Sequence, residues 1–600
     1  MTKRSPRLAV AILLAAALWL PLGVVLGWGG SFPSLSVADY AKVTEAAWSA
    51  AASSASVEVL VVLQEQAELL SLRSAAATEA PGFAIYQALW KTAATSQADL
   101  RAWLDARQIP HRSFYIVNAL LLEADRELLV SLAQRPEVAQ IMTNPRVAMP
   151  VAPSPAGAAA PQSVDGIPWG ISRIGAPEVW NLGYHGEGVV VAGQDTGYAW
   201  DHPALKAQYR GWDGVVANHD YNWHDAIYKD GGTCGVESPV PCDDNGHGTH
   251  TMGTMVGDDG LGHQIGVAPA ARWIGCRNMS EGVGTPATYA ECFEFFLAPY
   301  PVGGDPSQGD PDRAPDVINN SWSCPLYEGC DAAHIAFLEQ VVTVVREAGI
   351  LVVASAGNRG AACGTISEPV GMYDAAFTVG ATFSDALDTI APFSSRGTGT
   401  SLIKPDLAAP GVSVESALPG GGYDYKSGTS MAAPHVAGAA ALLWSALPDL
   451  RGEVTTTEIL LASSSRAHTS TQCGDAVDAV PNNVYGWGRL DALAAVQRGF
   501  AETTVLVGTI REIGGAALPG ATVHVALDDT YAWKRVSDAA GFYVIRPLSG
   551  TYTVTASHPG YQPLVPVGLT MPAGITTTFN MTLTRPVPVT TTLYFPVIVN

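Results

Sequence analysis

Basic residues are scarce in this chain of 600 residues. It contains 33 lysines and arginines against 55 aspartates and glutamates, which gives a formal net charge of −22 at pH 7. Proteins that bind nucleic acid need a surplus of positive charge to neutralise phosphates. The composition therefore argues against a nucleic-acid partner, and the acidic excess by itself does not indicate another partner.

Charged residues of either sign are also few. They make up 15% of the chain, whereas 48% of the residues are hydrophobic. Long disordered chains show the reverse balance, because they cannot bury enough apolar surface to offset the entropy of ordering. Since a single hydrophobic core stops growing well below this length, we expect several folded domains.

A long apolar run opens the chain. Residues 8–26 follow three basic residues, and Pro21 interrupts the run. A positive start followed by an apolar stretch predicts an export signal over residues 1–30, with an uncleaved membrane anchor as the alternative. Either interpretation places the rest of the protein outside the cytoplasm. We expect a secreted, extracellular or cell-envelope protein, which meets a membrane only if this segment is retained.

The eight cysteines show no spacing typical of a zinc site. They all lie between residues 234 and 473, and their number is even, so disulfides are favoured in an exported protein. Sequence alone does not fix the connectivity. The pairs that we expect are Cys234–Cys242, Cys324–Cys330, Cys276–Cys292 and Cys363–Cys473.

The N-terminal part of the chain predicts a small α+β unit. Residues 31–55 are rich in Ala and Ser and are expected to be weakly ordered. The elements expected next are a strand at 57–63, a helix at 95–108, two strands within 112–124, a helix capped by Asp125 and a strand at 138–143. This order is the split βαβ pattern. We assign residues 56–149 to this unit and the Pro- and Ala-rich residues 150–165 to an exposed linker.

Residues 166–500 alternate apolar strands with helices. The expected strands lie at 188–197, 271–278, 316–322 and 349–358, and a helix is expected at 334–349. This alternation predicts an α/β region with a mostly parallel central sheet and helices on both faces. In such sheets functional groups gather beyond the carboxyl ends of the strands. Asp195, Ser321 and Asn358 stand at such ends.

The last part of the chain changes character again. Residues 503–584 contain short β-rich runs separated by Gly and Pro, which is typical of an all-β sandwich. Residues 585–600 form a Pro-punctuated tail, which we expect to be a loose terminus.

Three stretches of the α/β region supply the parts of a nucleophilic site. GTSMAAPHVAG places Ser430 at the start of a helix, where free N–H groups can stabilise an oxyanion. We expect Thr429 or Ser430 to cap this helix, and Pro434 to lie in its first turn. His247 lies in a Gly-rich turn, DDNGHGTHTMGT, and Asp195 ends a buried strand in QDTG. Each piece alone is a common cap, loop or turn, but together they predict a Ser-His-Asp triad.

These stretches resemble the signature blocks of a known family. QDTG, NGHGTHTMGT, ASAGN and GTSMAAPHVAG are similar to those of the subtilisin-like serine proteases (S8), in which the triad also runs in the order Asp, His, Ser. The resemblance covers about residues 166–498, and HPALKAQYRGWDG is similar to the bacillopeptidase F-like branch. It implies a subtilisin-like three-layer fold and an endopeptidase with Asp195, His247 and Ser430 as its triad. It also implies that Asn358 donates its amide to the oxyanion.

The resemblance further implies where a peptide substrate binds. An extended peptide would add to exposed edges as a strand and place one side chain in a primary pocket. The implied residues are Gly282, Val283 and Gly284 on one edge, Ser321, Trp322 and Ser323 on the other, and Ala354, Ser355 and Ala356 in the pocket. The family usually has Gly where this chain has Ser323, so the pocket entrance is expected to differ. Arg359 is expected either to favour acidic or polar substrate side chains or to be a solvated surface residue.

Other polar residues near these motifs are expected to be structural. His250 and His435 are assigned to packing. Asp243 and Asp244 are interpreted as solvated acids, with a calcium pair as the alternative. Many members of the family bind calcium through an aspartate at the position of Ala204 in this chain. We therefore assign no metal ligand, expect that catalysis requires no cofactor, and leave structural calcium open.

The flanking units complete the expected protein. Residues 56–149 resemble the inhibitory propeptide of the family, with a cut expected within 150–165. Residues 503–584 resemble a carboxypeptidase regulatory-like domain, through LPGATVHV and DAAGFYVIRPL. The sequence predicts a secreted serine endopeptidase made as a zymogen, whose partners are polypeptide substrates and its own propeptide. The alternatives are a non-catalytic surface or adhesion protein with a protease-like fold, and a transpeptidase or ligase that uses the same acyl-enzyme.

Overall fold

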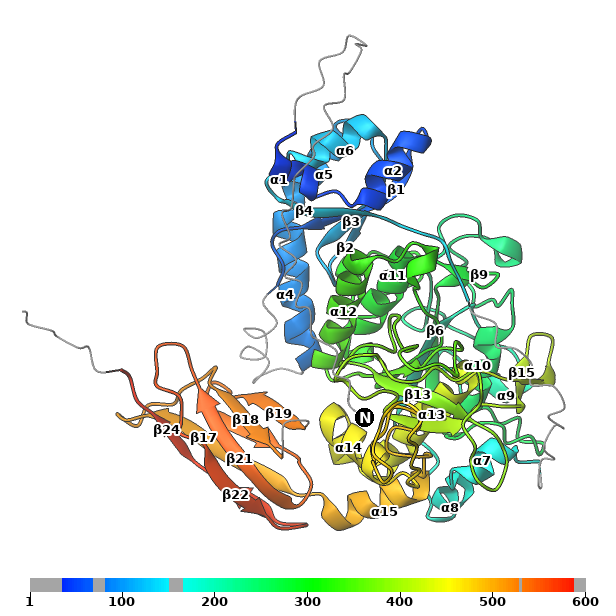
Figure 1. Ribbon diagram of the computed structural model, residues 1–600, viewed down its shortest axis with the longest axis vertical. Coiled ribbons are helices and arrows are strands. Elements are labelled where there is room, and N and C mark those ends of the chain that lie inside the picture. Colours follow the sequence, from blue (N-terminus) through cyan, green and yellow to red (C-terminus); the bar gives the residue numbers. More distant parts are fainter. Residues whose placement is uncertain (1–34, 68–80, 150–165, 528–530, 587–600) are drawn as a thin grey trace, which may run out of the picture.

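The computed structural model describes residues 35–67, 81–149, 166–527 and 531–586. The expected export signal and linker lie outside the described residues, as does most of the tail. The described chain forms three units in sequence order (Figure 1). The N-terminal unit (35–149) lies on the central unit (166–502), and the C-terminal unit (503–586) lies beside the central unit.

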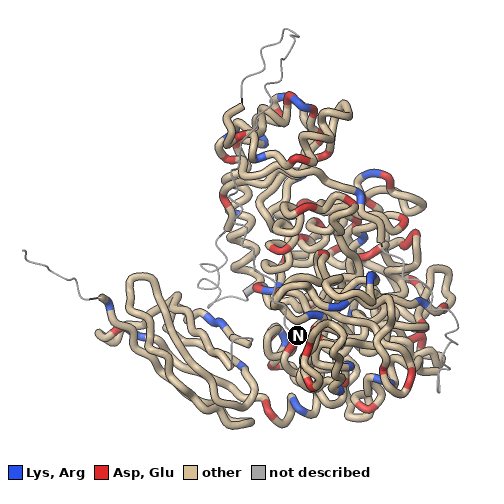
Figure 2. The backbone as a smooth tube through the Cα atoms, in the orientation of Figure 1, with Lys and Arg blue, Asp and Glu red and all other residues tan. Residues whose placement is uncertain are grey.

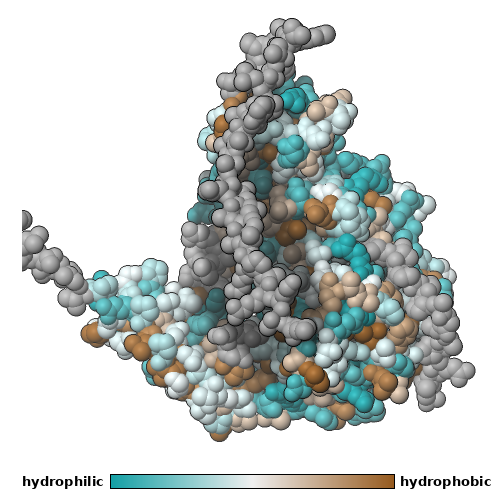
Figure 3. All heavy atoms as spheres, in the orientation of Figure 1, coloured by the Kyte–Doolittle hydropathy of each residue, from teal (hydrophilic) through white to brown (hydrophobic). Residues whose placement is uncertain are grey.

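Charged residues are spread over all three units. Figure 2 shows Lys and Arg interspersed with Asp and Glu along the described chain. Figure 3 shows hydrophobic and hydrophilic residues mixed on the face that it draws. Among the described residues, the structure contains no helix with the length and apolar character needed to span a membrane.

The N-terminal unit is an antiparallel sheet with the strand order β2-β3-β1-β4. Its strands are β1 (Val57–Leu63), β2 (His111–Phe114), β3 (Ala119–Ala124) and β4 (Val138–Thr143). Three of its helices are α4 (Pro81–Ser96), α5 (Ala98–Asp105) and α6 (Arg126–Ala133). The four strands and α6 were predicted, and Asp125 caps α6 by accepting a 2.7 Å hydrogen bond from the N–H of Leu128. The helix predicted at 95–108 is α5, and the sequence analysis missed α4.

The expectation that residues 31–55 are weakly ordered is wrong for most of this segment. The chain forms α1 (Val37–Ala41) and α2 (Glu45–Ser53), whose N-termini are capped by the side chains of Ser36 and Thr44. Trp48 is 6% exposed and belongs to the hydrophobic cluster on one face of the sheet. Alanine is the best helix former once a cap and a buried contact are supplied, and the composition alone did not show that contact.

The two faces of the N-terminal sheet are covered by different partners. Val59 and Val61 of β1 pack into the cluster formed with the unit's own helices. Leu60, between them, packs into a cluster that contains Phe293 and Val341 of the central unit. Because successive side chains of a strand point to opposite faces, the second face of this sheet is buried by helix α4 of its own unit and by docking onto the central unit.

The central unit is built on a seven-stranded sheet with the order β14-β13-β12-β11-β6-β8-β7. All neighbouring strands are parallel, which confirms the predicted α/β class. The strands are β6 (Val190–Asp195), β7 (Trp223–Asp225), β8 (Arg272–Arg277), β11 (Val317–Asn320), β12 (Leu351–Ser355), β13 (Phe377–Thr382) and β14 (Leu407–Pro410). Their carboxyl ends line one edge, where sites of such folds are found.

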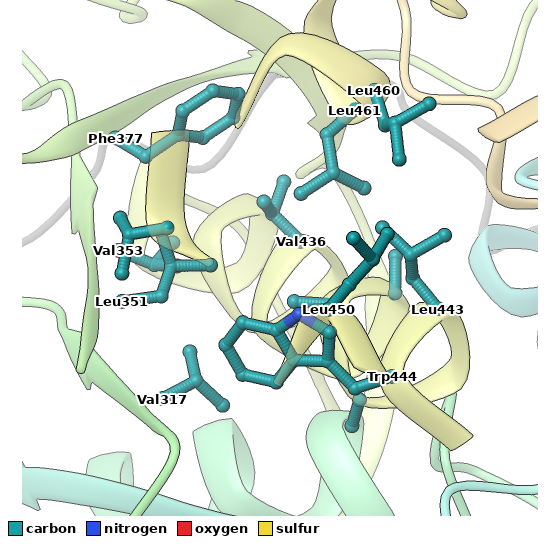
Figure 4. Packing of buried hydrophobic residues seen from close by; sticks show 14 of the residues in the cluster. Val317, Leu351, Val353, Phe377, Val436, Leu443, Trp444, Leu450, Leu460 and Leu461 are labelled. Carbon is teal, nitrogen blue, oxygen red and sulfur yellow. The ribbon is translucent and has the colours of Figure 1, made fainter. Parts of the chain in front are cut away.

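Helices cover both faces of this sheet and give the predicted three layers. The main helices are α10 (His247–Val256) and α13 (Thr429–Ala446) on one face, and α11 (Pro286–Leu297) and α12 (Ala332–Glu347) on the other. Figure 4 shows Val317 and Val353 of the sheet beside Val436 and Trp444 of α13. Ile318 follows Val317 along β11 and enters the opposite cluster with α11 and α12.

Shorter elements complete the central unit. The helices are α7 (Trp169–Arg173), α8 (Ala176–Asn181), α9 (Pro203–Lys206), α14 (Val454–Ser463) and α15 (Ala492–Glu502). The strands are β9 (Met279–Ser280), β10 (Val283–Gly284), β15 (Val414–Leu418) and β16 (Gly422–Lys426). The last two form a hairpin that lies against α10.

All eight cysteines form disulfides, in the pairs expected from the sequence. The bridges are Cys234–Cys242, Cys276–Cys292, Cys324–Cys330 and Cys363–Cys473. The bridge from Cys276 to Cys292 ties β8 to α11, so it fixes a helix on the central sheet. The bridge from Cys324 to Cys330 closes a short loop after β11, next to the expected substrate edge.

The C-terminal unit consists of two small sheets, as the sequence predicted. One contains β20 (Phe542–Ile545), β17 (Val505–Glu512), β23 (Thr576–Thr578) and β24 (Met581–Leu583). The other contains β19 (Ala532–Val536), β18 (Thr522–Ala526), β21 (Gly550–Ser557) and β22 (Val567–Met571). Leu506 and Ile510 of the first sheet and Val523 and Val525 of the second are buried between them.

Candidate active site

Asp195 and His247 meet at the carboxyl edge of the central sheet. Asp195 is the last residue of β6, and His247 is the first residue of α10. Nδ1 of His247 lies 2.7 Å from Oδ1 of Asp195, and the two residues are 6% and 1% exposed. A carboxylate can only accept here, so the imidazole carries its proton on Nδ1 and Nε2 is left as the basic nitrogen.

Neighbouring groups hold the Asp195 carboxylate in place. Its Oδ1 accepts a 2.7 Å hydrogen bond from the N–H of Thr196. Its Oδ2 lies 3.4 Å from Oγ1 of Thr251, one turn further along α10 than His247. These contacts fix the direction in which the carboxylate faces the imidazole.

Ser430 starts the helix that packs beside α10. It is the second residue of α13 and is 5% exposed, and α10 and α13 are in contact. The expected cap by Thr429 or Ser430 is not formed, because Gly428 is the N-cap and no side chain caps this helix. The hydroxyl of Ser430 is therefore not used as a cap, and it lies 3.4 Å from the carbonyl oxygen of Ser321.

Pro434 lies deeper in α13 than the sequence analysis expected. It is the sixth residue of this helix rather than a residue of the first turn. Because proline has no N–H, the carbonyl of Ser430, four residues earlier, loses its helical donor. The hydroxyl of Ser321 donates to that carbonyl instead, at 3.2 Å. Pro434 thus links the Ser430 backbone to the residue that follows β11.

Asn358 is bound to the residue that precedes Ser430. Its Oδ1 accepts hydrogen bonds from both the N–H and the hydroxyl of Thr429, each 3.0 Å long. The Thr429 hydroxyl also accepts a 3.1 Å hydrogen bond from the N–H of Gly357. These contacts orient the amide so that its nitrogen points away from Thr429. The sequence analysis missed this positioning role of Thr429, whose only signal was its place next to Ser430.

One of the expected substrate edges is occupied by the N-terminal unit. Its final strand, β5 (Val147–Ala148), pairs antiparallel with β10 (Val283–Gly284). The N–H of Met149 donates a 2.8 Å hydrogen bond to the carbonyl of Gly282. The edge formed by Gly282, Val283 and Gly284 therefore accepts an extended strand, in the manner in which proteins bind extended peptides.

The other expected binding residues follow the neighbouring strands. Ser321, Trp322 and Ser323 come directly after β11, and the Trp322 ring stacks on Tyr289 with 3.8 Å between centroids. Ala354 and Ser355 end β12, and Ala356 follows them. These residues are at most 8% exposed.

Arg359 is not a freely solvated surface residue, which was one of the two interpretations that the sequence allowed. Its Nη2 lies 2.6 Å from Oε1 of Glu368, whose side chain is 11% exposed. A carboxylate that the sequence analysis did not identify therefore already compensates the charge of Arg359. No motif marked Glu368, which lies in a loop.

His250 and His435 hold structural positions, as expected. Nε2 of His250 donates to the carbonyl of Val414 at 3.0 Å, and burial lowers its pKa to about 3. Nδ1 of His435 donates to the carbonyl of Met431 at 2.9 Å, and burial lowers its pKa to about 4. Both imidazoles are therefore neutral at neutral pH and are bound by backbone.

Asp243 and Asp244 organise the turn that leads into α10. Asp243 accepts from the hydroxyl of Thr196 at 2.8 Å and from three backbone N–H groups, those of Asn245, Gly246 and Thr249. Asp244 forms an ion pair with the buried Arg277. These carboxylates are therefore bound by protein donors rather than solvated. Over the part of the chain that the structure describes, no group of three or more His, Cys, Asp or Glu residues is placed to hold a metal ion.

Comparison with known proteins identifies two regions of the chain. The subtilase family model matches residues 186–488. The model of the carboxypeptidase regulatory-like domain matches residues 505–584. The first match covers the central sheet with Asp195, His247, Asn358 and Ser430, and the second covers the C-terminal β unit.

Two named relatives give the same assignment for the protease region. The chain is 38% identical over 432 residues to bacillopeptidase F of Bacillus subtilis (strain 168), a match that covers 69% of this chain but only 28% of that protein. It is 34% identical over 333 residues to Subtilisin Savinase of Lederbergia lenta, which covers 55% of this chain and 99% of that protein.

The fold has a solved counterpart. The crystal structure of fervidolysin from Fervidobacterium pennivorans, a keratinolytic enzyme related to subtilisin, superposes with a TM-score of 0.50 at 17% sequence identity, over 88% of this chain and 78% of that one. This likeness supports the fold, whereas the family match and the sequence relatives support the identity. The chain belongs to the subtilase family, with the central unit of a subtilisin-like serine endopeptidase followed by a carboxypeptidase regulatory-like domain.

Proposed function

We propose that this protein is a secreted serine endopeptidase, made as a zymogen, that hydrolyses peptide bonds through an acyl-enzyme on Ser430. The observation that carries the proposal is the 2.7 Å hydrogen bond between Asp195 and His247, together with the contact between α10, which His247 begins, and α13, which bears Ser430. A serine hydroxyl becomes a useful nucleophile when an oriented histidine takes its proton. The buried Asp195 supplies that orientation.

The reaction then runs in two halves. Nε2 of His247 takes the proton of Ser430 while Oγ attacks the peptide carbonyl, and the same nitrogen protonates the departing amine. Water then attacks the acyl-enzyme and gives a proton to Nε2 of His247, which returns it to Oγ of Ser430 as the bond between Oγ and the acyl group breaks and the acid leaves. In both halves the developing oxyanion accepts hydrogen bonds from the Asn358 amide and the N–H of Ser430. This scheme uses only groups of the protein, and we assign no cofactor to it and no structural calcium ligand.

The N-terminal unit acts as the inhibitor of the zymogen in this proposal. Its strand β5 occupies the edge at Gly282–Gly284 where a substrate would bind. Further from the site, Oε2 of Glu294 accepts from the N–H groups of Tyr115 at 2.5 Å and Ile116 at 3.0 Å. Arg112 of the same unit forms ion pairs with Glu237 and Glu291. A cut within residues 150–165 would separate this unit from the protease and free the edge.

Mass spectrometry on purified protein tests the proposal directly. We expect the wild-type chain to lose about 150 residues from its N-terminus, since the linker follows the inhibitory strand. The Ser430→Ala variant should stay uncut at that linker. The Ser445→Ala variant is the matched control, because Ser445 lies on the same helix and its hydroxyl bonds Glu187 at the surface; it should mature normally.

A second readout separates the alternatives. A fluorophosphonate probe should label the wild type at Ser430 and leave Ser430→Ala unlabelled. An uncut, unlabelled wild type would instead support a non-catalytic protein with a protease fold. Labelled protein that joins peptides to added amines rather than to water would support a transpeptidase or ligase.

A further inference from the structure

Three segments meet around the expected primary pocket. One of them carries Glu368, an acidic residue to which the proposed mechanism assigns no role. Ser323 follows β11, and Ser355 ends β12. The third segment, 368–371, closes against both: the Ser323 side chain opposes the rise in the pKa of Glu368 that burial causes, and Gly371 lies so close to Ser355 that an added Cβ would be 2.7 Å from its carbonyl oxygen. Glu368 therefore belongs to the wall of this pocket.

Arg359 is the present counter-ion of Glu368. The two side chains form a 2.6 Å ion pair, in which Arg359 is 37% exposed and Glu368 is 11% exposed. Arg359 also donates to the hydroxyl of Ser367 at 3.1 Å and lies over the ring of Tyr327, 5.3 Å from its centroid. Tyr327 is itself 66% exposed. The carboxylate is thus the fixed inner partner, and the guanidinium is the outer partner on a long side chain that reaches solvent.

A second carboxylate shifts the charge balance of this region. Glu328, in the loop closed by Cys324 and Cys330, interacts electrostatically with Glu368, and the backbone of Ala148 in β5 opposes the rise in the pKa of Glu328 that burial causes. Its Oε2 is buried without a hydrogen-bond partner among the described residues. Glu368 therefore faces one cation, the guanidinium of Arg359, and one further carboxylate, that of Glu328.

We propose that Glu368 makes the primary pocket select lysine or arginine on the acyl side of the scissile bond. The inference rests on the proposed protease function and names its substrate class. A substrate cation would pair with Glu368 while Arg359 turns outward to solvent, so the buried carboxylate exchanges one cation for another. A substrate carboxylate would instead face Glu328 and Glu368 and is disfavoured, because like charges repel strongly where water is excluded.

Two variants of the ion pair should shift the preference in opposite directions. Glu368→Gln keeps the shape of the side chain, removes its charge and leaves Arg359 without this counter-ion, so acidic substrates should gain relative to basic ones. Arg359→Ala removes the internal competitor for Glu368, so basic substrates should gain further. Glu453→Gln is the control, since Glu453 forms its ion pairs with Arg535 and Arg546 of the C-terminal unit.

The measurement is kcat/KM on peptides that differ only in the residue before the cut: Lys, Arg, Ala or Glu. We expect the matured wild type to favour Lys over Glu by at least about tenfold, the scale of one close charge pair. Glu368→Gln should lower the Lys-to-Glu ratio by about tenfold or more, and Arg359→Ala should raise it. Glu453→Gln should leave the ratio at the wild-type value.

The possible failures can be told apart. If the protein reacts with the fluorophosphonate and cleaves the Ala peptide, but Glu368→Gln keeps the wild-type ratio or the wild type prefers Glu, the specificity inference alone is wrong. If no peptide is cleaved and no probe is bound, the protease function fails and the inference with it. If Glu368→Gln does not fold, the direction of the Arg359→Ala shift decides the question.

Discussion

The N-terminal and C-terminal units contact the subtilase region at different places. The N-terminal unit reaches the active-site edge, where β5 pairs with β10, and buries one face of its sheet against α11 and α12 (Figure 1). The C-terminal unit meets α14: the indole N–H of Trp533 donates to the hydroxyl of Thr456 at 2.8 Å, and Arg535 pairs with Glu453.

This difference is the basis on which we propose that the N-terminal unit is an inhibitor and the C-terminal unit an accessory domain. A unit that lies on the substrate edge competes with substrates for the same backbone groups, whereas a unit that rests on α14 leaves those groups unchanged. Both interfaces contain ion pairs, so the type of contact does not distinguish the two roles. The position of each unit relative to the carboxyl edge of the central sheet distinguishes the two proposed roles.

The strongest test of this comparison adds each unit back separately. Residues 35–149, supplied to the matured enzyme at micromolar concentration, should suppress cleavage of a short peptide by more than about 90%, because β5 occupies the strand edge of the site. Residues 503–600 should leave the rate unchanged. Initial rates are measured against the concentration of each unit. If the C-terminal unit also inhibits cleavage, the proposed difference between the two units is wrong.

Two asparagines in similar settings give the next largest effect. Asn358 accepts from the N–H and hydroxyl of Thr429, and Asn580 in the C-terminal unit accepts from the same two groups of Thr509, at 2.9 and 3.1 Å. Asn358→Ala should lower kcat by about 10²–10³, the cost of one oxyanion donor in subtilisin. Asn580→Ala should leave kcat unchanged. Equal kcat values for the two variants would show that Asn358 is not a donor to the oxyanion.

Matched arginines at the two interfaces should behave differently. Arg112 pairs with Glu237 and the buried Glu291 across the N-terminal interface, and Arg535 pairs with Glu453 across the C-terminal one. Arg112→Ala should weaken inhibition by the N-terminal unit about 10- to 100-fold, because it leaves Glu291 without this charged partner. Arg535→Ala should not change the inhibition constant. An unchanged constant for Arg112→Ala would show that the apolar face alone holds the unit.

Counted per pH unit, the smallest expected effect is a pH dependence of docking. In the docked state burial raises the pKa of Glu294 to about 8, despite its hydrogen bonds from Ile116 and Tyr115. The exposed carboxyl of the free protease should titrate near its usual ~4.3. The docked state thus holds the proton more tightly. The extra affinity that this proton gives to docking is complete below the pKa of Glu294 in the free protease. It is lost as the pH rises from about 4.3 to about 8, and the dissociation constant changes by at most about tenfold per pH unit.

Fragment affinity measures this dependence. The Ser430→Ala chain, cut at the linker by an added protease, gives the two fragments whose dissociation constant is followed from pH 5 to pH 9. Glu294→Gln should flatten the curve, because the side chain no longer titrates. Glu453→Gln, at the other interface, should keep the wild-type slope. A wild-type curve without slope would show that docking does not change the protonation of Glu294 and would contradict this prediction.

Much of the fold could be predicted because the local patterns agree with the tertiary structure. The alternation in β1 and the long apolar strands of the central sheet indicated α+β and α/β units, since strand period and burial follow directly from side-chain order. Local cysteine spacing also indicated Cys234–Cys242 and Cys324–Cys330. Residues 37–53 were misjudged because their helices depend on burial of Trp48 against a sheet formed by later residues.

By itself, the sequence determined the α/β class, the order of the units and the candidate residues Asp195, His247, Asn358 and Ser430. Their motifs are contiguous, so no long-range information was needed. Only the tertiary structure decided which groups surround them: Thr429 holds the Asn358 amide, Ser321 binds the carbonyl that Pro434 leaves free, and Glu368 pairs with Arg359. Such contacts join loops far apart in the chain, and their partners are set by how parallel strands align at one edge.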